Sequence, residues 1–394
     1  MISEKMMMLG KKSNSIRALF EYGKKRRAEI GDENVYDFSI GNPSVPSPAK
    51  VNETLIRMLT EKDSVALHGY TSNAGDTAVR SAIASNIQRR FGFTTDANHI
   101  YMTCGAASSL RISLNAIILP GDEVILLAPY FAEYTVFAED AGASCVVVDC
   151  TEGSFALDFG KLESAITEKT KAIIINSPNN PSGVVLSEDD IRELSELLTR
   201  KQKEYSSEIY IISDEPYREL VYGGVSVPYI PCFYDNTIIC YSYSKSLSLP
   251  GERIGYIMVS PRAKDDADLF FAVCGAGRAL GYICAPSIFQ YLVAECDGMA
   301  SDISVYDTNR KLIYDALNEI GYTTASPDGA FYLFIKTLET DSIAFCERAK
   351  SFEILLVPGD DFGYPGWCRL SYCVTTDMIR RSIPAFRKLY DSYR

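Results

Sequence analysis

The segment KAIIINSPNNPSGVVLSEDDIRELSELLTRKQKEYSSEIYIISD, residues 171–214, decides the fold. It contains two short apolar runs, Lys171–Asn176 and Glu208–Ser213, and such runs are typical of buried parallel strands. Between them, Ser187–Tyr205 opens with Ser187 and Asp190 in capping-box spacing and continues with apolar residues at helical period. The segment therefore predicts a strand, a crossover helix and a second strand parallel to the first.

The same pattern extends to both sides of this unit. Further apolar runs occur at Glu123–Ala128, Ser144–Val148, Thr237–Ser242 and Ile254–Val259, and each of them predicts another buried parallel strand. Repeated alternation of strands and helices favours an α/β fold with a doubly wound sheet. Ligands of such sheets gather beyond the carboxyl ends of the strands, so the motifs directly after the strands matter most.

The pattern changes near Ser301, where a helix, a strand near Ala330, a second helix, short strands near Leu355 and Arg369 and a final helix are expected. A chain of 394 residues is too long for one simple core. We predict a large domain over 46–295 with a mostly parallel sheet, and a smaller α+β domain over 296–394. The N-terminal segment 1–45 is expected to pack on the small domain.

Composition excludes several classes of protein. A formal net charge of -12 gives no basic excess for binding nucleic acid. The 11 cysteines are scattered singly, which predicts reduced thiols and a cytoplasmic location. No apolar run is long enough to span a membrane, and the first 30 residues lack the pattern of a secretory signal. With only His68 and His99, a histidine-rich metal centre is excluded and no metal is predicted.

A candidate reactive group follows one of the predicted strands. Ser242, Tyr243, Ser244 and Lys245 come directly after the run 237–242, and Arg253 lies eight residues beyond Lys245. A lone lysine in a loop is ordinarily a solvated cation. The functional interpretation of Lys245 depends on the other motifs that follow predicted strands.

Those motifs supply what a flat, phosphate-bearing aromatic ring requires. The small residues of 103–109 precede a predicted helix at Leu110–Ile118, and a helix start of this kind binds phosphate together with a fixed cation such as Arg253. Asp214 ends a strand, where its carboxylate can keep a ring nitrogen protonated. Tyr217 and Asn180 are placed to bind a ring hydroxylate, and Phe131 offers a stacking surface.

In this order, the motifs resemble those of the class I and II aminotransferases of pyridoxal 5'-phosphate (PLP) fold type I, the aspartate aminotransferase superfamily. The likeness spans nearly the whole chain. It rests on Ile40-Gly41-Asn42-Pro43, His68-Gly69-Tyr70, the Gly105 turn, Pro129-Tyr130-Phe131, Asn180-Pro181-Ser182-Gly183, Asp214–Tyr217, Ser242–Lys245 with Arg253, Gly329-Ala330-Phe331-Tyr332 and Arg369-Leu370-Ser371.

The resemblance implies a PLP-dependent enzyme of amino acid metabolism and biosynthesis. It would move an amino group from an L-amino acid to a 2-oxo acid by a ping-pong mechanism, with PLP held by Lys245 as a Schiff base. It also implies a homodimer with shared active sites.

The implied roles of individual residues follow from the same likeness. Catalysis would fall to Lys245, Asp214 and Tyr217, and substrate binding to Gly41, Asn180 and Arg369, with Arg369 clamping the α-carboxylate. The remaining cofactor contacts would come from Gly105, Ala106, Ala107, Phe131, Ser242, Ser244 and Arg253, and from Tyr70 of a neighbouring subunit.

Departures from the family leave the substrate open. Some members carry a lysine in the phosphate turn for a distal carboxylate, but this chain has Ala107 there. Arg278 lies near a position where other members use an arginine from the partner, although its offset from Pro286 does not match. Tyr101, Tyr130, Phe331 and Tyr332 would either favour a bulky substrate side chain or serve as packing residues.

Two other functions are compatible with parts of this pattern. A PLP-dependent C–S β-lyase or decarboxylase would need the same cofactor residues, although Asp214-Glu215-Pro216-Tyr217 follows the aminotransferase form. A non-catalytic PLP-binding sensor, such as half of a transcription regulator, would need a DNA-binding module that residues 1–35 are too few to form.

Overall fold

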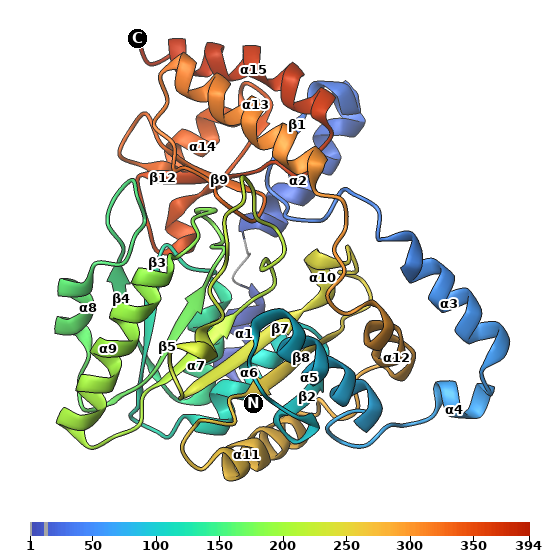
Figure 1. Cartoon of the computed structure of the whole chain (residues 1–394). Coiled ribbons are helices and arrows are strands. Elements are labelled where there is room, and N and C mark those ends of the chain that lie inside the picture. Colours follow the sequence, from blue (N-terminus) through green and yellow to red (C-terminus); the bar gives the residue numbers. More distant parts are fainter. Residues whose placement is uncertain (1, 12–14) are drawn as a thin grey trace.

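A seven-stranded sheet forms the centre of the molecule (Figure 1). The computed structural model describes residues 2–11 and 15–394. Every neighbouring pair from β7 to β4 is parallel, which confirms the predicted α/β fold with a mostly parallel sheet. In spatial order the strands are β2 (Ile100–Thr103), β8 (Gly255–Val259), β7 (Thr237–Ser242), β6 (Tyr210–Asp214), β5 (Thr170–Asn176), β3 (Glu123–Ala128) and β4 (Ser144–Asp149).

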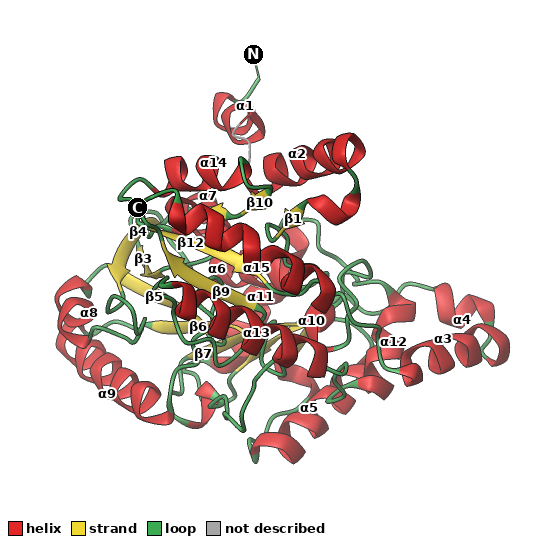
Figure 2. Cartoon of the chain, turned by 90° about the horizontal axis from the view of Figure 1, so that it is seen from above, coloured by secondary structure: helices red, strands yellow, loops and turns green. Residues whose placement is uncertain are grey.

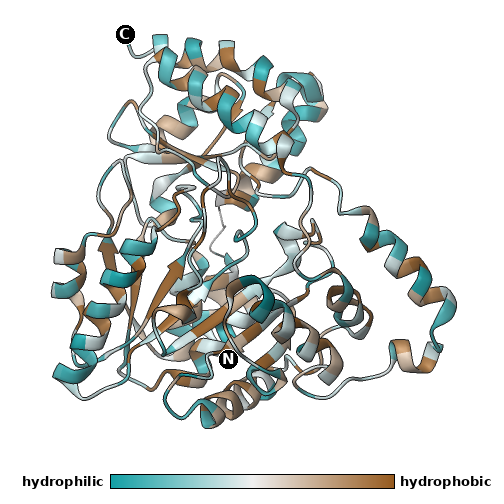
Figure 3. Cartoon of the chain, viewed as in Figure 1, coloured by the Kyte–Doolittle hydropathy of each residue, from teal (hydrophilic) through white to brown (hydrophobic). Residues whose placement is uncertain are grey.

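Helices cover both faces of this sheet because successive residues of each strand point to opposite sides. Val124 and Leu126 of β3 pack in one core cluster, whereas Ile125 packs in another. The first face carries α6 (Ala106–Ile117), α7 (Glu133–Ala141) and α11 (Asp266–Ala279). The second carries α5 (Thr77–Phe91), α8 (Phe159–Ala165), α9 (Glu188–Tyr205) and α12 (Ser287–Cys296). The central strands stand out as the apolar part of the chain in Figure 3.

The crossover helix α9 begins as its sequence predicts. Ser187 is the N-cap, and its hydroxyl accepts a hydrogen bond from the Asp190 amide at 3.1 Å. The Asp190 carboxylate in turn accepts one from the Ser187 amide at 2.8 Å. This capping box satisfies two amides at the helix start that have no partner within the helix.

Two expectations need correction, and one strand was missed. β8 was expected to be parallel, but it pairs antiparallel with both β7 and β2. The strand β2 at the sheet edge was not predicted. The helix expected at Leu110–Ile118 begins four residues earlier, at Ala106, so the small-residue turn already forms the first helical turn of α6.

The C-terminal part forms a second layer above the sheet edge (Figure 1). A three-stranded antiparallel sheet in the order β11, β12, β9 lies there. Some of its side chains pack in a core cluster formed mostly by C-terminal residues, and others pack in the cluster that contains α8 and α9. The elements of the C-terminal part are α13 (Ser304–Ile320), β9 (Tyr332–Lys336), α14 (Ser342–Lys350), β10 (Ile354–Leu355), β11 (Val357–Pro358), η4 (Gly359–Phe362), β12 (Trp367–Ser371) and α15 (Thr376–Asp391).

The N-terminal segment contacts this C-terminal part. β1 (Tyr36–Asp37) pairs in parallel with β10, and Arg26 of α2 (Ser15–Ile30) forms an ion pair with Glu353 at 2.6 Å. The remaining elements of this N-terminal segment are α1 (Glu4–Lys11) and η1 (Asp32–Asn34). Among the residues described, no helix combines the length and the apolar character needed to cross a bilayer.

Two helices, α3 (Ala49–Glu61) and α4 (Ser64–His68), project from the body as an arm in both Figure 1 and Figure 2. Several large apolar side chains of this arm are exposed, among them Val65 at 81%. The loop that follows the arm carries Tyr70, which is 99% exposed. The arm therefore presents apolar surface that the single chain does not cover.

The carboxyl ends of the parallel strands meet at one edge of the sheet, and the predicted motifs follow them. Asp214 ends β6, and β5 leads into Asn179 and Asn180. β7 runs into the short helix α10 (Tyr243–Ser246), which carries Lys245. The 3-10 turns η2 (Ala97–His99) and η3 (Ile230–Cys232) connect elements elsewhere.

Candidate active site

A cavity of about 290 Å³ lies at the carboxyl edge of the sheet, below the C-terminal layer. Most of the predicted site residues line it, although they come from distant parts of the sequence. These are Gly41, Ala106, Ala107, Phe131, Asn180, Asp214, Tyr217, Ser242, Ser244, Lys245, Arg253 and Arg369. Ile16, Leu110, Asn176, Pro216, Pro250 and Tyr332 complete the lining.

Lys245 projects into this cavity as a buried amine. Its Nζ donates a hydrogen bond to the Gly41 carbonyl at 2.6 Å and lies 5.3 Å from the centre of the Phe331 ring. Burial lowers the pKa of Lys245 to about 8, and the charges of Arg369 and Arg253 act in the same direction. A lysine with such a pKa is partly neutral near physiological pH, and the neutral amine is nucleophilic.

Asp214 lines the cavity, and its two carboxylate oxygens differ in their hydrogen bonding. Its Oδ2 accepts a hydrogen bond from the Tyr134 hydroxyl at 2.5 Å and a longer one from the Asn176 amide at 3.5 Å. Oδ1 is buried and has no hydrogen-bond partner within the described part of the chain. Burial raises the pKa of Asp214 to about 7, against the effect of the Tyr134 hydrogen bond. A cationic partner at Oδ1 would favour the charged carboxylate.

The small-residue turn after β2 lies against Arg253. Gly105 has a φ of +92°, and a Cβ atom built on it would lie 3.3 Å from Arg253 Nη2. Gly255 allows β8 to approach this turn, since a Cβ there would lie 3.0 Å from the Gly105 Cα. On the other side, the Ser242 and Ser244 hydroxyls are 2.8 Å apart. Backbone amides at the start of α6, two hydroxyls and a guanidinium thus form an anion site.

Arg369 of β12 lies at the top of the cavity. Its Nη1 donates to Asn180 Oδ1 at 3.0 Å, and its Nη2 donates to the Ser39 carbonyl at 2.6 Å. Its Nε is buried and lacks a hydrogen-bond partner among the described residues. Because these contacts leave the guanidinium charge unneutralised, the group is suited to bind a carboxylate.

Aromatic side chains surround the reactive lysine. The Tyr217 and Tyr332 hydroxyls are 3.0 Å apart, and burial raises the pKa of both phenols. Phe131 lines the cavity, with its edge contact to Tyr134 at 5.6 Å between ring centres. Phe331 is buried beneath Lys245.

These residues suit PLP, the cofactor that the resemblance implies. The partnerless Asp214 Oδ1 matches a protonated ring nitrogen, because burial without a partner is unfavourable for a carboxylate. The turn at Gly105 with Arg253 matches the phosphate, and the buried amine of Lys245 matches the aldehyde. The donor set therefore fits the cofactor at three separate points.

Some predicted residues lie elsewhere. Tyr70 is outside this cavity in the single chain, and Arg278 is exposed at the end of α11. Tyr101 is buried and donates a hydrogen bond to the Tyr282 carbonyl, so its suggested contact with a bulky substrate is wrong for the single chain. Of the four aromatic residues suggested for that role, only Tyr332 lines the cavity.

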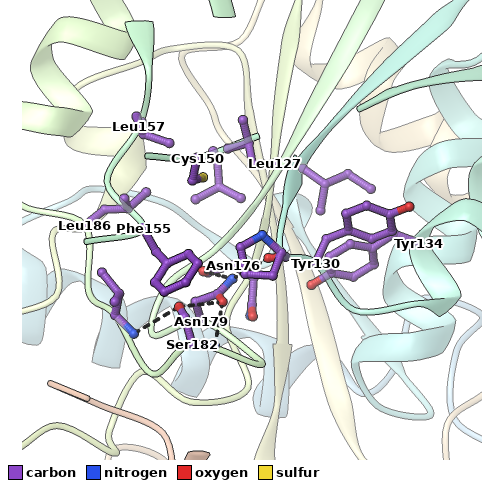
Figure 4. Close-up of a pocket in the computed structure, with 14 residues that line it drawn as sticks. Leu127, Tyr130, Tyr134, Cys150, Phe155, Leu157, Asn176, Asn179, Ser182 and Leu186 are labelled. Carbon is purple, nitrogen blue, oxygen red and sulfur yellow. Dashed lines mark hydrogen bonds between the residues drawn. The ribbon is translucent and has the colours of Figure 1, made fainter. Parts of the chain in front are cut away.

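Tyr130 instead lines a second, smaller cavity, which shares the lining residue Asn176 with the first (Figure 4). Its volume is about 30 Å³, roughly the share of one water molecule in the liquid. Asn179 and Ser182 lie at its edge and are hydrogen bonded to each other at 2.8 Å. This cavity is too small for a substrate, so the chemistry belongs to the larger one.

Sequence reasoning missed Tyr134, Asn176, Ile16 and Leu110. Asn176 had a usable signal, since it ends a strand beside the strand that ends at Asp214, and the two residues are in register. Leu110 follows Ala107 by three residues on α6, so both lie on one helix face. Ile16 and Tyr134 come from segments whose positions only the tertiary structure reveals.

Comparisons with known proteins agree with this geometry. Residues 33–386 match the family described as aminotransferase class I and II. An aminotransferase of Eubacterium rectale of known structure is 55% identical, with a TM-score of 0.98 and coverage of 100% of this chain and 99% of that one.

Two relatives carry more specific names. An aspartate aminotransferase of Thermotoga maritima is 30% identical over 366 residues, which cover 91% of this chain and 92% of that protein. An aromatic-amino-acid aminotransferase of Thermococcus litoralis is 27% identical over 405 residues and covers 98% of both. The relatives thus share one type of reaction and differ in the amino acid for which they are named.

Proposed function

The chain belongs to the class I and II aminotransferases, and from this premise we propose that Lys245 is the residue that carries the cofactor of its reaction. The protein is a PLP-dependent enzyme that transfers an amino group between an amino acid and a 2-oxo acid. The observation that carries the assignment of the site is that Asp214, whose buried Oδ1 has no hydrogen-bond partner among the described residues, lines the same cavity as Lys245, Arg253 and Arg369.

The phosphate is held by the turn between β2 and α6. Gly105, Ala106 and Ala107 offer backbone amides, Ser242 and Ser244 offer hydroxyls, and Arg253 supplies the charge. Tyr70 of the partner subunit completes this site. Support comes from the closeness of Arg253 to the Gly105 turn, where a Cβ built on Gly105 would lie 3.3 Å from Arg253 Nη2, and from the exposure of Tyr70.

The ring is held by four other residues. Asp214 pairs with the ring nitrogen, Tyr217 and Asn180 bind the ring oxygen, and Phe131 stacks on the ring face. The α-carboxylate of the substrate binds to Arg369, with Gly41 and Asn180 beside it. The hydrogen bond from Arg369 to Asn180 supports this arrangement because it fixes the guanidinium plane.

When bound, PLP supplies an aldehyde that reacts with amines and a protonated ring that stabilises negative charge at the substrate Cα. Lys245 acts as general base and acid: its Nζ takes the proton from the substrate Cα and later returns a proton. The pKa of about 8 suits this role, since both protonation states are populated near neutral pH. The 2-oxo acid product leaves before the second 2-oxo acid enters, in ping-pong order.

The decisive experiment compares the wild type with Lys245→Ala and Lys245→Arg. Wild-type protein loaded with PLP is mixed with a panel of amino acids, and the visible absorption of the bound cofactor is followed. We expect the wild type to convert the cofactor to its amino form and both variants to lose this conversion. If either variant still turned over at the normal rate, Lys245 would not be the nucleophile.

We also propose that the enzyme is a homodimer with shared active sites. The exposed apolar arm of α3 and α4 and the exposed Tyr70 beside it support an interface there. Light scattering is expected to give twice the mass of one chain.

The domain division proposed is 1–45 with 296–394 as the small domain and 46–295 as the large domain. The pairing of β1 with β10 and the core cluster formed mostly by C-terminal residues support it. We further propose a cytoplasmic location and a role in amino acid biosynthesis. The thiols that the structure describes are unpaired, which suits a reducing compartment.

A further inference from the structure

The cationic side chains of the site cavity are Lys245, Arg253 and Arg369, as far as the described residues show. Each already has a task in the proposed function. Lys245 reacts with the cofactor, Arg253 faces the phosphate turn, and Arg369 is the group that remains for the α-carboxylate. No cation of this lining is left for a second carboxylate on the substrate.

The lining residues that have no role in the proposed function are mostly apolar, with Asn176 and Tyr332 as the polar exceptions. α6 contributes Ala107 and, one turn later on the same face, Leu110. Phe131 comes from the loop before α7, and Ile16 comes from the start of α2. Three separate elements thus contribute hydrocarbon to the lining of this cavity. A buried carboxylate without a counter-ion is strongly disfavoured there, whereas a hydrocarbon side chain gains by leaving water.

We propose that the amino acid substrates of this enzyme have uncharged, apolar side chains, and that Ile16 is a residue that sets this selectivity. This inference rests on the proposed function of the site, in particular on Arg369 as the α-carboxylate clamp. It assigns the substrate end to side chains of the leucine or methionine type rather than to those of aspartate or glutamate.

The first test uses three amino acids of nearly equal shape. L-leucine, L-asparagine and L-aspartate carry apolar, neutral polar and charged groups of similar size. Conversion of the enzyme-bound cofactor is followed after rapid mixing with each of them. We expect kcat/KM to fall in that order, with leucine at least about tenfold above aspartate, which corresponds to about 1.4 kcal/mol. An aspartate value equal to or above that of leucine would overturn the proposal.

A binding measurement separates selectivity from chemistry. 4-Methylpentanoate and succinate match leucine and aspartate but lack the amino group, so they bind without reacting. Titration of the holoenzyme with each acid, followed by the cofactor absorption, should give tighter binding of 4-methylpentanoate. Tighter binding of succinate would contradict the assignment.

A matched pair of variants tests Ile16. Ile16→Arg places a cation in the cavity lining, and Ala18→Arg adds the same charge to the exposed side of the same helix. We expect Ile16→Arg to shift the aspartate-to-leucine ratio of kcat/KM at least about tenfold toward aspartate, and Ala18→Arg to leave it unchanged. Equal aspartate-to-leucine ratios of kcat/KM in the two variants would show that Ile16 does not set the selectivity.

Arg278→Leu provides a further check on the source of any second cation. We expect the preference for leucine to persist in this variant. If the wild type preferred aspartate and Arg278→Leu abolished that preference, a cation outside this cavity would set the selectivity and the proposal would fail. Conversion by none of the amino acids would instead count against the proposed function, so the two failures are distinguishable.

Discussion

Burial of the reactive lysine affects stability as well as chemistry. The pKa of Lys245 is lowered from 10.5 to about 8. Below pH 8 the amine is charged in the folded and the unfolded chain, and the folded form bears the whole desolvation penalty. Between pH 8 and 10.5 the folded chain loses the proton first, so stability rises with pH.

We therefore expect Lys245→Met to stabilise the cofactor-free protein at pH 7, by up to about 3 kcal/mol, less the lost hydrogen bond to Gly41. The gain should shrink as pH approaches 10.5. Urea unfolding of the cofactor-free proteins at pH 7 and 10 measures it, with the exposed Lys169→Met as control. A gain in stability from Lys245→Met that grew with pH would contradict the expected direction of the pH dependence.

Tyr134 is predicted to position the Asp214 carboxylate. Its hydroxyl donates to Asp214 Oδ2 and opposes the rise in the pKa of Asp214 caused by burial. In Tyr134→Phe we expect the cofactor to bind about 10- to 100-fold more weakly, because hydrogen bonds to charged groups contribute about 1.5–3 kcal/mol. Equilibrium titration of cofactor-free protein with PLP measures this.

Tyr130→Phe is the matched control, since the Tyr130 hydroxyl accepts a long hydrogen bond from Thr135, at 3.4 Å. Its affinity for PLP should stay near that of the wild type. If both variants bound PLP equally well, the role of Tyr134 would be structural.

The residues predicted from sequence were those whose chemistry is visible in a motif, such as Lys245, Asp214 and Arg253. Tyr134 acts through its hydrogen bond to Asp214, and no local sequence pattern indicates that contact. Asn176 lies between these cases, because its place at a strand end beside Asp214 follows once the strand order is known.

At the level of elements, the approach of β8 to the phosphate turn depends on Gly255. A Cβ at this position would meet the Tyr241 carbonyl and the Gly105 Cα, which are both backbone atoms that cannot move alone. We expect Gly255→Ala to destabilise the protein by about 1–3 kcal/mol and to weaken PLP binding. Denaturant unfolding and PLP titration measure the two effects.

Gly160→Ala in α8 is the comparison for this variant. A Cβ there meets only Asp158 Oδ1, at 3.5 Å, and alanine favours a helix. Stability should therefore stay constant or rise slightly, with unchanged PLP affinity. Similar losses of stability and PLP affinity in the two variants would show that the close approach of β8 to the phosphate turn is not the cause.

Elements were predicted well where burial alone defines them. The bounds of β3 and β7 agree with the apolar runs of the sequence. The antiparallel direction of β8 could not be predicted from its sequence, because an apolar run indicates that a strand is buried but not which way it runs. The connection from β7 to β8 holds only the short helix α10, whereas a parallel crossover usually returns across the sheet in a longer helix. The strand β2 was missed because its four residues are too few for a hydrophobic period to be recognised in the sequence.

For the whole molecule, shared sites make a prediction about mixtures. Tyr70→Ala and Lys245→Ala are each expected to lose most activity as pure proteins. If Tyr70 of one subunit serves the Lys245 site of the other, a hybrid dimer has one intact site. Mixing the two variants under conditions that exchange subunits should restore activity above that of either parent. Unchanged activity in a mixture with proven hybrids would show that each site belongs to one chain.

The buried Asp214 Oδ1 and Arg369 Nε have a consequence for the life of the protein in the cell. Polar atoms buried without partners weaken a fold, and a ligand that satisfies them adds stability that grows with its free concentration. Newly made copies that meet little free PLP are then the ones most exposed to proteolysis. The amount of enzyme would follow the supply of its cofactor, even at a constant rate of synthesis.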